Sequence, residues 1–186
     1  MGSANTTTLL GTGVDTQETR EEIQFRADGD NASLYMDWPT GSDQELFLIV
    51  EGNRVKAWRG EDEEAFDRAD VPPVVFAQQY LMNLMDCASE VDPNLPLNGI
   101  INGEDGYYSF ALDADKLSTV MDLSSFSEVY LALLSLAVDD RGRVAYAVID
   151  LYGVSDGFTT TEQQITTDID LFEIGFTEVS SIDEFY

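Results

Sequence analysis

The chain has 186 residues, 44% of them hydrophobic, and its 36 Asp and Glu against 9 Lys and Arg give a formal net charge of −27. Such an acidic surface excludes binding of nucleic acid and of anionic lipid headgroups, because both are held through clustered cations. There is no histidine and only one cysteine, Cys87. Catalysis by a Ser-His-Asp or Cys-His set, an intrachain disulfide and a thiolate zinc cluster are therefore excluded.

The length is that of one domain with a full core, and no apolar run approaches the ~20 residues of a membrane-spanning helix. Only Lys56 and Lys116 are lysines. Many carboxylates with few lysines are typical of proteins that face concentrated salt, and equally of an ordinary acidic surface protein. Met1-Gly2-Ser3 indicates an added leader, so we expect residues 4–186 to form a single domain, with any signal peptide already removed.

The first third of the chain predicts strands. A Thr-rich segment over 6–16 is interrupted by two glycines. Apolar residues alternate with polar ones over 22–27 and again over 32–38, on either side of the turn residues 28–31, which predicts a hairpin. Residues 45–50 and 54–58 flank Gly52-Asn53 and predict a second hairpin.

One apolar helix is predicted over residues 72–89. Pro72 and Pro73 suit a first helical turn, where the N–H would be unpaired, and Asp70 is placed to cap the helix. The segment is apolar nearly all round. A helix without a wide polar face must be covered on most sides, so we expect it to lie in the concavity of the sheet.

The second half predicts further strands over 106–112, 129–138, 143–152, 157–170 and 172–179, with a helical turn over 113–121. Residues 139–142 predict a third hairpin turn. Short turns between long strands favour a meander, in which strands that are neighbours in sequence pair in space. The predicted fold class is α+β: a curved antiparallel β-meander, or half-barrel, packed on one central apolar helix.

This order of elements resembles the LolA-like fold of bacterial lipoprotein carriers and of the related mycobacterial lipoproteins of the LppX and LprG kind. The segment Leu134 to Asp150, with Val138-Asp139-Asp140-Arg141-Gly142-Arg143-Val144 at its bend, looks like the closing hairpin of those proteins. The terminal segment Phe176 to Tyr186, with Val179 and Ile182, is similar to their last strand. The resemblance implies a half-open barrel that shelters a lipid or other apolar molecule, in an extracellular protein tethered to the membrane by a lipidated cysteine upstream.

Soft and aromatic side chains on the predicted helix and strands could line such a pocket. The candidate lining residues are Met36, Trp38, Trp58, Phe76, Tyr80, Met82 and Met85. Plain core packing explains the same residues. The leading hypothesis is thus a non-enzymatic binding protein for a lipid or apolar molecule, and the alternative is a structural or adhesive cell-surface domain with a closed core and an acidic outer face.

Catalysis and metal binding receive little support from the motifs. A pair of carboxylates could hydrolyse a glycosidic bond, but with so many Asp and Glu no particular pair stands out. Acidic stretches at 28–31, 62–67 and 104–105 offer oxygen ligands for calcium without the ordered spacing of an EF-hand loop, and solvated loops explain them better. We therefore predict no catalytic residue, no metal site, no cofactor and no nucleic-acid partner.

Overall fold

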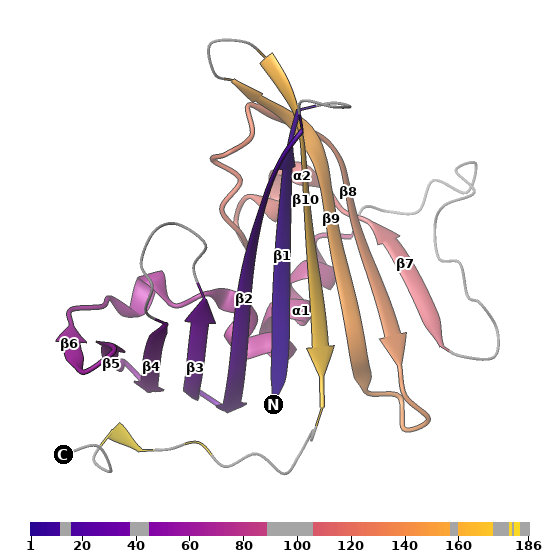
Figure 1. Ribbon diagram of the computed structural model, residues 1–186. Coiled ribbons are helices and arrows are strands. Elements are labelled where there is room, and N and C mark those ends of the chain that lie inside the picture. Colours follow the sequence, from indigo (N-terminus) through magenta and orange to yellow (C-terminus); the bar gives the residue numbers. More distant parts are fainter. Residues whose placement is uncertain are drawn as a thin grey trace.

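The computed structural model describes residues 1–11, 16–37, 45–88, 106–156, 160–172, 179 and 181–182. These residues form one open antiparallel sheet of ten strands with short helical segments on one face (Figure 1). The strands are β1 (Gly2–Leu10), β2 (Gln17–Asp28), β3 (Asn31–Asp37), β4 (Leu46–Glu51), β5 (Arg54–Arg59), β6 (Asp62–Glu64), β7 (Tyr107–Ala111), β8 (Glu128–Val138), β9 (Val144–Asp156) and β10 (Thr160–Leu171).

The strand order, β6-β5-β4-β3-β2-β1-β10-β9-β8-β7, consists of two meanders. Strands β1 to β6 form the first and β7 to β10 the second, and the first strand pairs with the last to join them, with Ala4 opposite Ile169. The predicted hairpins are confirmed: β2 pairs with β3, β4 with β5, and β8 with β9. Gly29 and Gly52 take the positive φ that the first two turns require.

The first and last predicted strands differ from the structure. The sequence predicts a first strand over 6–16, but β1 begins at Gly2 and ends at Leu10. In the sheet, β1 lies between β2 and β10. A strand was predicted over 172–179, yet Phe172 and Val179 are not in a strand, and 173–178 lie outside the described residues. Ten strands also make a larger sheet than a half-barrel implies.

The helical segments are short. They are the 3₁₀ helices η2 (Arg68–Asp70) and η3 (Pro73–Phe76), and the α-helices α1 (Ala77–Asp86) and α2 (Ala114–Leu117). Asp113 caps α2, because its Oδ1 accepts hydrogen bonds from the N–H groups of Asp115 and Lys116. The predicted cap by Asp70 is wrong: Asp70 lies in η2, which Asp67 caps, and η3 begins after Pro72 without a side-chain cap.

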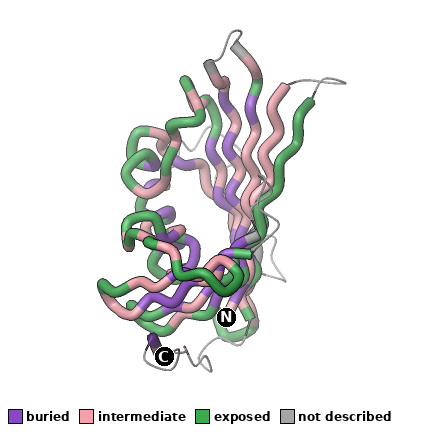
Figure 2. The backbone as a smooth tube through the Cα atoms, turned by 60° about the vertical axis from the view of Figure 1, so that its left-hand side comes forward, coloured by how far each residue is buried: buried purple, intermediate pink, exposed green. Residues whose placement is uncertain are grey.

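The predicted helix over 72–89 is shorter than expected and is covered on one side only. Its inner residues Tyr80, Leu81 and Leu84 are buried, whereas Met82 and Met85 are 53% and 44% exposed. Segments η3 and α1 form the core together with the inner face of the sheet, and buried and exposed residues alternate along the strands (Figure 2). The helix therefore packs on the sheet with one face and meets solvent with the other.

The core lies between the helical segments and one face of the sheet, which we call the inner face. Its strand residues sit at every second position, as in Leu46, Leu48 and Val50 of β4. Gly153 of β9 has no side chain because the segment after α2 packs directly on it. A Cβ there would clash with the Glu128 carbonyl oxygen and would lie 2.6 Å from Cδ1 of Phe126.

The opposite, outer face is covered in part by the end of the chain. The Ser181 hydroxyl donates a hydrogen bond to Oε1 of Glu51 over 3.0 Å, and Ile182 is 1% exposed. Ile49 lies on the same face of β4 as Glu51 and is fully buried, although the helices are on the other side. The C-terminal residues thus bury part of the outer face over β4.

Candidate functional site

Half-buried residues lie on the inner face of the two central strands, between the areas where the helices pack. The main contacts of η3 with the sheet fall on β2 and β3, and those of α2 on β8. Beyond the buried pair Ala4 and Ile169, the inner residues of β1 as far as Leu10 and of β10 as far as Ile165 are only half-buried. We call this set the inner strip; it consists of Thr6, Thr8, Leu10, Ile165 and Thr167.

The inner strip is apolar with hydroxyl groups set into it. Thr6 and Thr167 pair across the two strands, with their Oγ1 atoms 3.1 Å apart. Next to them on β2, the inner residues Thr19 and Glu21 are exposed, so this end of the inner face is open among the described residues. Ile165 packs against the core and supplies apolar surface beside the threonines.

Gln163 continues the inner strip toward the end of β10, opposite Leu10. It is 7% exposed and is the one buried polar residue of the described chain. Its Nε2 donates to the Ser125 hydroxyl over 3.2 Å, but its Oε1 has no hydrogen-bond partner. A buried amide oxygen without a donor costs about 1–3 kcal/mol, so a donor group that reached Gln163 Oε1 would be stabilised there.

The structure places the predicted lining residues in different environments. Met36 of β3 and Tyr80 of α1 are buried on the core side, and Phe76 is half-buried against the core. Trp58 lies on the outer face, opposite Phe47, so it is remote from the space between sheet and helix. Met82 and Met85 face solvent. Trp38 lies outside the described residues.

The outer face carries a row of three aromatic residues, of which the sequence analysis singled out only Trp58, as a candidate lining residue of the inner space. Tyr35, Phe47 and Trp58 are direct partners across β3, β4 and β5. Their ring centroids lie 4.6 Å apart for Tyr35 and Phe47, and 5.8 Å apart for Phe47 and Trp58. The alternation indicates this face for Tyr35 and Trp58, which are out of phase with the buried residues of their strands, whereas β4 is apolar over 46–50 and gives no such signal for Phe47.

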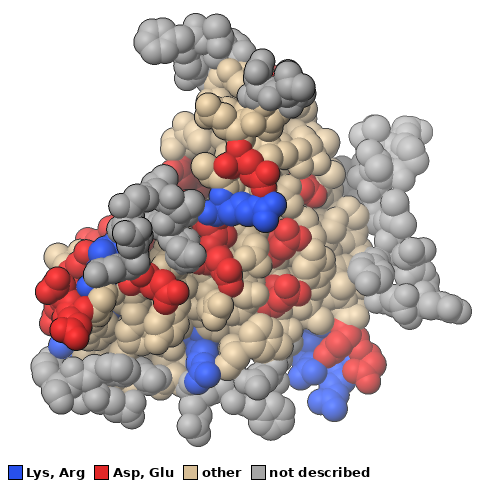
Figure 3. All heavy atoms as spheres, in the orientation of Figure 1, with Lys and Arg blue, Asp and Glu red and all other residues tan. Residues whose placement is uncertain are grey.

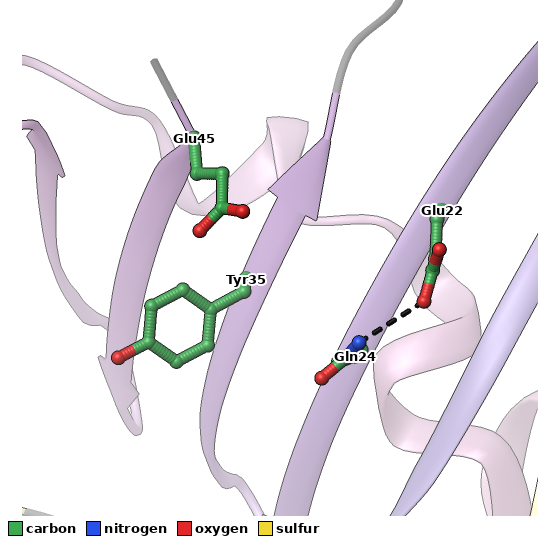
Figure 4. Close-up of a pocket in the computed structure, with 4 residues that line it drawn as sticks. All are labelled: Glu22, Gln24, Tyr35 and Glu45. Carbon is green, nitrogen blue, oxygen red and sulfur yellow. Dashed lines mark hydrogen bonds between the residues drawn. The ribbon is translucent and has the colours of Figure 1, made fainter.

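A surface hollow of about 270 Å³ lies beside Tyr35 and is lined by Glu22, Gln24, Tyr35 and Glu45 (Figure 4). Gln24 Nε2 donates to Glu22 Oε1 over 3.0 Å. Glu45 lies above the Tyr35 ring in this view, with Glu22 on the far side from β4. On this face of the molecule, carboxylates are spread over β2, β9 and β10 with few cations among them (Figure 3).

A second hollow of about 330 Å³ lies at the other end of the outer face. A bulge in β8 between Val129 and Leu131 turns Tyr130 outward, and its hydroxyl donates to Glu162 Oε2 over 2.8 Å. Gln164 Nε2 contacts the Tyr152 hydroxyl over 3.3 Å. The polar groups of this hollow thus hydrogen-bond to one another. Its lining residues are Leu9, Gly11, Thr16, Tyr130, Tyr152, Glu162 and Gln164.

Three of the described groups have large shifts in pKa. Burial raises the pKa of Tyr80 to about 12. The hydrogen bond from the Tyr146 hydroxyl to Asp168 on the outer face raises the pKa of Tyr146 to about 12. Asp139 accepts hydrogen bonds from the backbone and guanidinium of Arg143, which lower its pKa to about 2 and fix the turn between β8 and β9. Each shift has a structural cause, either burial or a hydrogen bond to a neighbouring residue.

Within the described part of the chain, no three or more Asp, Glu or Cys residues come together as a metal site. Cys87 is buried at the end of α1, and burial raises its thiol pKa. Among the helices that the structure describes, none is long and apolar enough to cross a membrane.

Comparison with protein-family models and with curated proteins finds no match. Among solved structures, the chain is similar to a LolA superfamily protein from Nitrosomonas europaea, with 13% sequence identity and a TM-score of 0.34. The match covers 93% of this chain and 86% of the other.

Proposed function

We propose that this domain is a binding protein, which holds an elongated apolar molecule carrying a hydrogen-bond donor against the inner strip, between α1 and α2. The observation that carries the proposal is the inner strip itself. The inner face is buried where η3, α1 and α2 pack on it and only half-buried along the inner strip between them.

The chemistry of the inner strip supports an apolar ligand. Leu10, Ile165 and the threonine methyl groups would each gain from contact with hydrocarbon, at roughly 25 cal/mol per Å² of apolar area removed from water. Half-buried hydrophobic residues that follow α2 extend this surface toward β8 and β9; they are Val120, Met121, Leu123 and Phe126.

Gln163 supports a ligand that also carries a donor. A hydroxyl or amide N–H that reaches Gln163 Oε1 would satisfy the buried oxygen, and the hydrogen bond would add to binding. A plain hydrocarbon would leave this oxygen without a partner. Fatty alcohols, monoacylglycerols and ceramide-like amides have the required chemistry, since each joins a long chain to a neutral donor.

A pair of adjacent substitutions tests the proposal. Thr8 lies on the inner strip, and Thr7 beside it points to the outer face. We expect the tryptophan of Thr8→Trp to fill the inner strip and to weaken binding of the fluorescent probe N-phenyl-1-naphthylamine by roughly tenfold. A tenfold loss of affinity corresponds to about 1.4 kcal/mol of binding free energy. The fluorescence of the probe measures its binding. This probe is neutral and is not repelled by the acidic surface.

Thr7→Trp is the matched control, because it adds the same side chain to the same strand on the other face. It should bind the probe as the unsubstituted protein does. Equal affinities for all three proteins, with circular dichroism showing each of them folded, would mean that the inner strip does not bind apolar molecules.

The alternative, a structural or adhesive domain with a closed core, is favoured by one observation: both described hollows lie on the outer face. The same probe experiment separates the two functions, since a closed core leaves no place for a neutral apolar molecule. An extracellular location and a lipid anchor upstream of this chain remain predictions from the sequence.

A further inference from the structure

We propose that the hollow beside Tyr35 on the outer face binds an arginine or lysine side chain presented by a basic segment of a partner protein. This site is on the opposite face of the sheet from the inner strip, and it is independent of the proposed apolar ligand.

The geometry of Tyr35 provides a platform for a cation. Its ring is backed by Phe47 at a centroid distance of 4.6 Å, while the residue remains 51% exposed. A ring held from one side by a second aromatic residue has few ways to move, and its free face presents the negative π-cloud that attracts ammonium and guanidinium groups.

The other lining residues complete the chemistry of a cation site. Glu22 and Glu45 place carboxylates on two sides of the hollow, and Gln24 adds an amide. Two described cations lie on the outer face of β2 near the hollow: Arg20, which is paired with Glu18 at 2.6 Å, and Arg26, two residues beyond Gln24. Neither of them lines the hollow.

The small free energy of a single cation–π contact favours a protein segment over a small cation as the ligand. A single exposed cation–π contact stabilises a complex by only ~0.5–1 kcal/mol, which does not retain a free amine or amino acid at ordinary concentrations. A segment with several basic residues adds further contacts through effective concentration. The net charge of −27 steers such a segment to the surface, whereas nucleic acid and anionic membranes are repelled.

The first test changes the side chain at position 35 and leaves the net charge of the protein unchanged. Binding of a fluorescently labelled, acetylated tri-arginine amide is measured by anisotropy at low salt for three proteins: unsubstituted, Tyr35→Phe and Tyr35→Leu. The ring is kept in Tyr35→Phe, which should bind as the unsubstituted protein does. Tyr35→Leu should bind about two- to fivefold more weakly, as expected for one cation–π contact. Equal binding by Tyr35→Leu would overturn the proposal.

The second test separates a local site from general attraction to an acidic protein. The double variant Glu22→Gln with Glu45→Gln removes two charges at the hollow, and Asp86→Asn with Asp115→Asn removes two exposed charges on the helical side. The first pair should weaken binding more than the second. Equal weakening would show that only the net charge matters.

Free arginine in place of the peptide should bind much more weakly, and equal binding would contradict a partner segment.

Discussion

Leu84→Ala should lower the free energy of unfolding by about 2–5 kcal/mol and the melting temperature by about 10 °C, one of the largest effects of any single substitution in this chain. Leu84 is fully buried in the last turn of α1, on the side of the helix that faces the core. The substitution leaves a cavity that the surrounding strands cannot close. Urea unfolding monitored by circular dichroism measures the change.

Met85→Ala is the control for this prediction, because Met85 is the next residue of the same helix and is 44% exposed. It should change the free energy of unfolding by no more than about 0.5 kcal/mol. Similar losses for the two variants would mean that α1 does not pack on the sheet by the face described.

The melting temperature should rise steeply with salt, on the order of 10 °C between about 0.1 M and 1 M NaCl, as the Debye length falls from about 10 Å to about 3 Å. The cause is repulsion among 36 acidic residues that only 9 basic residues offset. Differential scanning calorimetry at several salt concentrations measures the slope.

A variant with less charge tests the cause of this effect. Glu21→Gln, Asp62→Asn, Glu63→Gln and Asp86→Asn together remove four exposed carboxylates. Such a variant should be more stable at low salt and should respond less to added salt. A flat response of the unsubstituted protein would contradict the prediction and would remove the argument that this composition suits concentrated salt.

The hairpins could be predicted because their signals are local. Alternation over 22–27 and 32–38 and the glycines of the turns decide the pairing of β2 with β3 without help from the rest of the chain. The pairing of β1 with β10 joins residues about 160 positions apart, such as Thr6 and Thr167. No local pattern records such a contact, so the joining of the two meanders became visible only in the structure.

The predicted helix shows where composition misleads. Met82 and Met85 made the segment apolar all round, and apolar residues were expected to be buried. Burial depends on what lies opposite, however, and methionines on the far side of α1 remain exposed. Trp58 was expected to line the inner space, but the face on which a strand residue lies depends on the register of the strand. Ala57 is buried on the inner face, so its neighbour Trp58 lies on the outer face.

Native mass spectrometry of the protein, purified without detergent and incubated with oleyl alcohol, tests the proposed binding of an apolar molecule most directly. We predict a one-to-one adduct for the unsubstituted protein and for Thr7→Trp, and little or none for Thr8→Trp. Absence of any adduct from the folded, unsubstituted protein, or an adduct that Thr8→Trp leaves unchanged, would contradict a binding site on the inner strip.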